Sequence, residues 1–166
     1  ADHKAHLRAH YTHMPYTMPA NVEVYVPADI IARQEKERMD RAEEARAEFE
    51  EFCRLRQLSH DWELTTHDAI DALTLRARYA DVVVVGQAEN GSVPMGIADL
   101  PPELVLACGR PMIVVPFAGS FTEAGQRVMV AWNGSREATR AVHDALPILK
   151  RSRKTIVFSV DADSER

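Results

Sequence analysis

Four consecutive valines, Val82–Val85, constrain the fold more than any other feature of the chain. A second apolar run, Pro111–Pro116, follows after a loop and a short helical segment that Pro101 opens. Continuous β-branched runs without polar alternation are typical of strands buried on both faces of a parallel sheet. The connection between the two runs is too long for a hairpin and has the length of a crossover. Both runs therefore predict buried strands of an α/β protein.

The remaining segments alternate in the same way between strand and helix patterns. Four further strands are expected, at His6–Thr12, His60–Thr65, Val128–Ala131 and Thr155–Val160. One helix is expected after Pro27, and a second from an Asp68 N-cap to about Tyr79. A third is expected from a Ser135 N-cap to Leu149, and Pro147 removes one backbone hydrogen bond in its last turns. A short extended segment is expected at Val22–Val26. Six strands separated by helices predict an open parallel sheet with helices on both faces.

Charge and cysteine content limit the classes of function. Lys and Arg number 20 and Asp and Glu 25, which gives a net charge of −5 and disfavours a nucleic-acid or anionic-membrane partner. The uncharged stretches are shorter than the roughly 18 residues of a membrane span. Ala1–Lys4 lacks the pattern of a secretory signal, so a cytoplasmic protein is expected. Cys53 and Cys108 lie in apolar surroundings without a C-x-x-C partner, and both are expected to be buried, reduced thiols.

Three segments resemble the universal stress protein family. Ala80–Gly86 and Leu104–Pro116 are similar to the closing half of such a domain, and Arg127–Ala138 resembles its opening strand and helix. The resemblance covers almost the whole chain. It implies an adenine-nucleotide hydrolase-like, Rossmann-like fold, a role in stress response or signalling, and homodimer formation.

Compared with the family, the elements stand in permuted order. Residues 1–118 correspond to strand 2 through strand 5, residues 119–126 to a linker, and residues 127–166 to strand 1, helix 1 and strand 2 of a following repeat or of the same domain. A sheet without its central first strand would leave its neighbours unpaired. Val128–Ala131 is therefore expected beside Asp81–Val85, within one chain or across a dimer.

A phosphate loop is expected after the valine strand if the family's nucleotide site is retained. In the family, this motif is a Gly, two residues, a second Gly, nine residues, and then a Gly followed by Ser or Thr. Gly86 fits the first glycine, whereas the position of the second glycine is occupied by Glu89. The final Gly and Ser or Thr fall on Asp99–Leu100 or, counted back from the helix, on Ala98–Asp99. Carboxylates at these positions repel a polyanion, unless they hold Mg²⁺. Gly91 and Gly96 offer a loop in a different register. ATP is thus expected to bind weakly or not at all.

The candidate ligand-binding residues lie at the carboxyl ends of two predicted strands, where parallel α/β sheets bind ligands. They are Gly86, Gln87, Asn133, Gly134 and Ser135. The family often has Asp where this chain has Asn133. The alternative interpretation of Asn133–Ser135 is a tight turn with an N-cap.

Neither a catalytic nor a metal site is predicted. No Ser, His and Asp series can be placed along the sequence, and Ser135 lacks a nucleophile elbow. His3, His6, His10 and His13 are expected to face solvent or an interface, and Arg8 between His6 and His10 disfavours a cation.

The function expected from these features is a non-catalytic stress-response or signalling module with weak or no adenine-nucleotide binding. One alternative is a nucleotide-dependent hydrolase or ligase on the related fold, with Gly86, Asn133 and Ser135 holding ATP. Another is a dimerisation module without a ligand.

Overall fold

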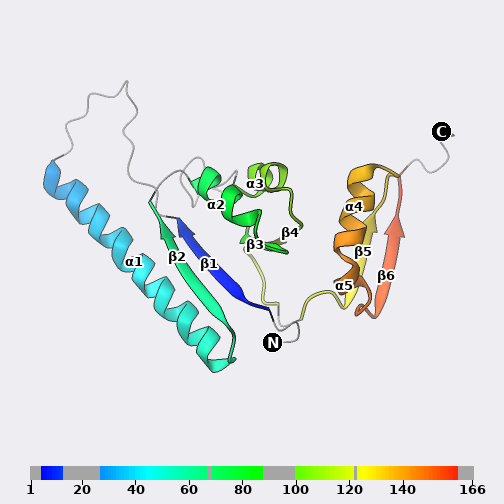
Figure 1. Ribbon diagram of the computed structural model, residues 1–166, viewed down its shortest axis with the longest axis horizontal. Helices are drawn as coiled ribbons and strands as arrows, with labels where there is room; N and C mark the ends of the chain where they lie inside the picture. The colour runs from blue at the N-terminus through cyan, green and yellow to red at the C-terminus, as the bar shows by residue number, and fades with distance from the viewer. Residues whose placement is uncertain (1–4, 13–26, 67–68, 88–99, 122, 161–166) are drawn as a thin grey trace, which may run out of the picture. The chain divides into compact units, whose positions relative to one another are not determined.

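The computed structural model describes residues 5–12, 27–66, 69–87, 100–121 and 123–160. The chain divides into two compact units, residues 1–76 and 77–166. Helices and strands alternate up to β4, β4 is followed directly by β5 and α4 by α5, and all three strand pairs are parallel, so the protein is mixed α/β (Figure 1). Within this described part, no helix is long and apolar enough to cross a membrane.

The first unit is a strand, helix, strand crossover followed by a helix. Strand β1 (Leu7–Thr12) pairs in parallel with β2 (His60–Thr65), and α1 (Ala28–Leu55) connects them. α2 (Ala69–Ala77) follows β2 and ends at the boundary between the units. Both strands begin within a residue of their expected positions, because alternating polarity is a local signal.

Alternation gives the β1–β2 pair one apolar and one polar face. Tyr11 stacks on Trp62 with ring centroids 5.9 Å apart, and Phe49 of α1 contacts the ring of Trp62 from the same side. α1 therefore packs on the apolar face through Phe49 and runs alongside β2 (Figure 1), and Cys53 is fully buried as expected. The opposite face carries the polar side chains of both strands, namely Arg8, His10, Asp61 and Glu63.

Ion pairs lie along the outer face of α1. Arg46 Nε donates to Glu50 at 2.8 Å one turn on, and Arg54 Nε donates to Glu51 at 2.6 Å. These are i,i+4 and i,i+3 pairs, which support a helix whose outer face is in solvent.

The second unit contains two further parallel pairs. β3 (Val83–Gly86) pairs with β4 (Met112–Val115) through the crossover helix α3 (Leu100–Cys108). Leu104 is 0% exposed, and Cys108 is buried as expected, so one side of α3 is packed.

The last pair is β5 (Arg127–Ala131) with β6 (Lys154–Phe158), which lies next to α4 (Arg136–Asp144) in Figure 1. The single helix expected up to Leu149 is instead two, because α4 ends at Asp144 and a four-residue helix α5 (Leu146–Leu149) follows. Pro147 explains the break, since it has no N–H and its ring opposes the carbonyl of residue 143. Gly125 precedes β5 at φ 78°, where a Cβ would lie 2.7 Å from Ile148 Cγ2.

The valine strand was predicted to be buried on both faces, and this prediction is wrong for a single copy of the chain. Val84 is 61% exposed, Val114 is 47% exposed, and every residue of β6 is exposed. The described strands form three separate two-stranded sheets, each strand hydrogen-bonded to one neighbour. Apolar residues of these strands, such as Val84 and Val114, therefore remain exposed within the part of the chain that the structure describes.

Several expectations fall on residues outside the described part. These are the extended piece at Val22–Val26, the Asp68 N-cap, the phosphate-loop residues Glu89, Gly91, Gly96 and Asp99, and the histidines His3 and His13.

Candidate functional site

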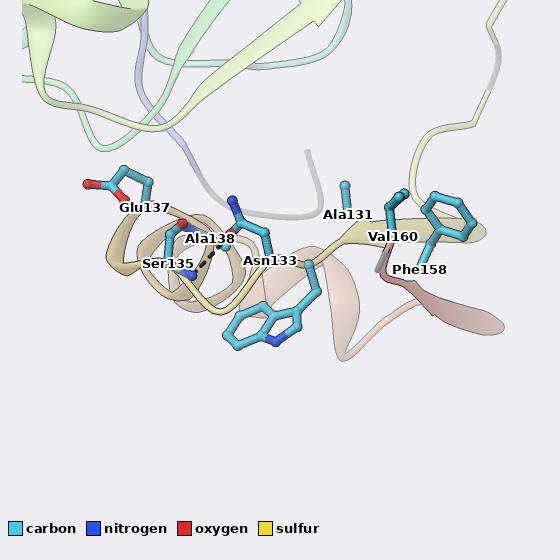
Figure 2. A pocket seen from close by; sticks show the side chains of 8 residues that line it. Ala131, Asn133, Ser135, Glu137, Ala138, Phe158 and Val160 are labelled. Atoms are coloured by element: carbon cyan, nitrogen blue, oxygen red, sulfur yellow. Dashed lines mark hydrogen bonds between the residues drawn. The ribbon is translucent and has the colours of Figure 1, made fainter. Parts of the chain in front are cut away.

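The turn that follows β5 is built by its own polar side chains. The backbone N–H of Ser135 donates to Asn133 Oδ1 at 3.0 Å, and the N–H of Ala138 donates to Ser135 Oγ at 3.1 Å (Figure 2). Gly134 between them has φ 71°, a conformation that glycine adopts without strain. The expected Ser135 N-cap is confirmed, and the alternative interpretation of Asn133–Ser135 as a capped turn describes this geometry.

A pocket of about 380 Å³ lies beside this turn. It is formed where the carboxyl ends of β5 and β6 meet the amino end of α4, and it is lined by Ala131, Trp132, Asn133, Ser135, Glu137, Ala138, Phe158 and Val160. In Figure 2, Phe158 and Val160 lie on one side of it and Ser135 and Glu137 on the other. The backbone N–H of Trp132 donates to the carbonyl of Phe158 at 2.8 Å, which joins the two strand ends.

The chemistry of the pocket is apolar with an acidic rim. Trp132, Phe158 and Val160 supply apolar wall, and the one charged side chain of the lining is Glu137. Its carboxylate is 76% exposed and lies 3.7 Å from the Arg136 guanidinium. Such a pocket accepts a flat, uncharged group more readily than a phosphate, because the carboxylate repels an anion.

Gly86 and Gln87 lie at the end of the other strand pair. Gly86 is in register with Val115, and the N–H of Gln87 donates to the Val115 carbonyl at 2.7 Å. A Cβ at Gly86 would meet nothing within 4 Å. The structure brings Asn133, Gly134 and Ser135 together in one turn, but neither Gly86 nor Gln87 lines the pocket beside it.

A second polar cluster lies at the amino ends of β1 and β2, and the sequence did not predict it. Ser59 Oγ is 2.8 Å from His6 Nδ1, and His6 Nε2 is 3.1 Å from Asp61 Oδ2. Arg8 Nη2 donates to the same carboxylate oxygen at 3.2 Å. The hydrogen bonds from His6 first, and from Arg8 second, hold the pKa of Asp61 below its ordinary value. The expectation that no Ser, His and Asp series exists is therefore wrong.

Further along the same face, His10 and Glu63 face each other. His10 Nε2 is 3.5 Å from Glu63 Oε2, and the His10 side chain is only 9% exposed. Of the two positions expected for the histidines, solvent or an interface, His10 does not occupy the first. The Arg76 guanidinium of α2 is hydrogen-bonded to Glu63, and this bond is the main cause that lowers the pKa of Glu63. Across the described residues, no three His, Cys, Asp or Glu side chains are grouped to hold a metal ion.

Only the register of the two strands could have revealed this cluster from the sequence. His6 and Arg8 alternate on one segment, and Ser59 and Asp61 alternate on another, 53 residues away. Each pair is unremarkable alone. They meet because Leu7 pairs with His60 in a parallel ladder.

Comparison of the chain with protein-family models, curated proteins and solved structures finds no match.

Proposed function

We propose that the chain is a non-catalytic, universal stress protein-like module for stress response or signalling, which acts in the cytoplasm as a homodimer and binds adenine nucleotides weakly or not at all. The observation that carries this proposal is the pocket at the end of β5. It lies at the carboxyl edge of a parallel strand pair, beside a helix start, where α/β proteins bind ligands.

The composition of the pocket lining supports weak nucleotide binding in particular. An adenine ring matches the apolar side chains of Phe158 and Val160, which lie together at one side of the pocket (Figure 2). The one charged side chain of the pocket lining is Glu137, which repels phosphates, although the Arg136 guanidinium lies 3.7 Å from its carboxylate. The nearby turn uses Ser135 Oγ for its own cap. A neutral nucleoside is therefore the better ligand for this lining.

The proposal includes a single sheet with helices on both faces. In it, β5 pairs with β3, so that Val130 lies near Val84, within one chain or between two copies. This pairing joins β5–β6 to β3–β4 and covers strand surface that is exposed at Val84. Parallel two-stranded sheets are rarely stable alone, which favours such a union.

Calorimetric titration of the full chain with adenosine, with ATP and with ATP plus Mg²⁺ tests the function. We expect adenosine to bind at least as tightly as ATP. Glu137→Gln should raise ATP affinity by about threefold and leave adenosine affinity unchanged, since one exposed charge is removed. Glu48→Gln, on the exposed face of α1, is the matched control and should change neither.

Three outcomes would contradict the proposal. Submicromolar ATP binding without metal would show that phosphate repulsion is not decisive. Binding only with Mg²⁺ that Glu89→Ala abolishes would instead assign a metal-bridged phosphate site to the loop after β3. Hydrolysis of ATP that Asn133→Ala and Ser135→Ala both abolish would favour the enzyme alternative.

A further inference from the structure

The cluster of Ser59, His6 and Asp61 contains the parts of an activated hydroxyl nucleophile. We propose that Ser59 accepts an acyl group from an activated ester or thioester, with His6 as its general base and Asp61 as the carboxylate that positions the imidazole. The site belongs to the first unit and is independent of the proposed function.

The strand register creates this arrangement. Leu7 pairs with His60, so His6 precedes β1 at the level where Ser59 precedes β2, and Arg8 lies beside Asp61. The N–H of Leu7 donates to the carbonyl of Ser59 at 2.9 Å, which fixes the two strand starts against each other. Alternate residues of a strand share a face, so the four polar side chains lie on the same side.

The hydrogen bonds define one consistent protonation pattern. The ionised carboxylate of Asp61 can only accept a hydrogen bond, and its Oδ2 lies 3.1 Å from His6 Nε2. In the neutral imidazole, Nε2 therefore carries the hydrogen. Nδ1 then has a lone pair that accepts the Ser59 hydroxyl hydrogen at 2.8 Å. The two ring nitrogens are exchanged relative to a serine protease, but either nitrogen acts as a base when the other is protonated and held.

Arg8 supports the carboxylate in this role. Its guanidinium donates to Asp61 at 3.2 Å, and together with His6 it lowers the pKa of Asp61. Asp61 therefore remains an acceptor at neutral pH. Nucleophile, base and a third group that orients the base are the signature of covalent chemistry at a hydroxyl.

The proposed step is a single acyl transfer. Ser59 Oγ attacks the acyl carbon, its proton passes to His6 Nδ1, and the new Oγ–C bond forms as the bond to the leaving group breaks. The leaving alkoxide, phenolate or thiolate takes the electron pair, and the imidazolium loses its proton to solvent. Because the His6 and Asp61 side chains are 46% and 54% exposed, the base works in water and the donor needs a good leaving group.

Intact-mass analysis and peptide mapping after exposure of the full chain to p-nitrophenyl acetate test this proposal. We expect one acetyl group on Ser59, and no such product from Ser59→Ala. His6→Ala should slow acetylation of Ser59 by at least about tenfold, in line with the usual contribution of a general base. Asp61→Asn should give a smaller loss, because the amide oxygen still accepts from the imidazole.

Ser152 provides the internal comparison. Its hydroxyl lies against the Leu149 carbonyl and Thr155 Oγ1 and has no imidazole among these contacts. Acetylation of Ser59 no faster than Ser152, or equally fast in His6→Ala, overturns the proposal. Circular dichroism of each variant shows whether it is folded, so that the acetylation rates are compared between folded proteins. Ser59, His6 and Asp61 are all exposed enough to tolerate substitution.

Discussion

At the scale of single residues, the polar face of β1–β2 concentrates the charge interactions of the first unit. Glu63 is the shared partner of Arg76 and His10, and Asp61 is the shared partner of His6 and Arg8. Both carboxyls have pKa values below their ordinary values of 4.5 and 3.8. The arrangement joins β1, β2 and α2 by side chains rather than by an apolar core.

These two pKa values predict how stability depends on pH. A carboxyl with a lowered pKa in the folded protein contributes stability above its unfolded pKa and loses it as pH falls through the folded pKa. Urea midpoints should therefore fall as pH decreases below about 4.5. Glu63→Gln should be less stable at neutral pH and show a smaller acid-induced loss, whereas Glu48→Gln should follow the unmodified protein. A slope in Glu63→Gln equal to that of the unmodified chain would refute this assignment.

At the scale of elements, local signals were enough to predict most of the structure. β2 spans His60–Thr65 as expected, and α1 begins directly after Pro27, because periodicity and proline act over a few residues. Ser135 was predicted as a cap for the same reason. The serine–histidine contact could not be predicted, since it depends on a register between segments 53 residues apart. The exposure of Val84 was also missed, because a strand pattern does not reveal what packs on it.

The cap of α4 can be tested directly. Ser135→Ala removes the acceptor for the Ala138 N–H and should lower the free energy of unfolding by about 1 kcal/mol. Ser135→Asp should restore most of this loss, because its carboxylate accepts the same hydrogen bond near the helix amino end. Chemical denaturation followed by circular dichroism measures both changes, and a neutral Ser135→Ala would contradict the cap.

Two leucines of α3 form a matched pair for its packing. Leu104 is 0% exposed and Leu106 is 87% exposed on the same helix. Leu104→Ala should destabilise the protein by roughly 3 kcal/mol through lost burial and a cavity. Leu106→Ala should change the unfolding free energy by less than about 0.5 kcal/mol. Equal losses in the two variants would mean that the packed side of α3 is assigned wrongly.

At the scale of the whole molecule, exposed apolar strands dominate the behaviour we expect. Val84, Met129 and Val157 are 61%, 70% and 65% exposed, and they lie on three different strands of the second unit. Surfaces of this kind promote association, since both apolar area and unpaired strand edges are available.

Light scattering at micromolar concentration should therefore detect a species heavier than the 18.6 kDa chain. If β3 and β5 pair between two copies, Val84→Lys places a charge at that contact and should shift the protein toward the monomer, with at least about a tenfold weaker association. Tyr79→Lys, at a residue that is 83% exposed and outside the strands, is the control and should not. A monomer in the unmodified chain would contradict homodimer formation.

The parallel pairing of β1 with β2 also determines when the first unit can form during synthesis. Among the described strands, β1 is hydrogen-bonded to β2 alone, and the ribosome makes Ser59, which precedes β2, 53 residues after His6, which precedes β1. At about 5 to 20 residues per second, the ribosome imposes a delay of roughly 3 to 10 s. During this interval α1 can form, because its ion pairs are local, whereas β1 still lacks the partner strand that the structure gives it. α1 can therefore form before the β1–β2 pair, and its charged outer face favours contact with water.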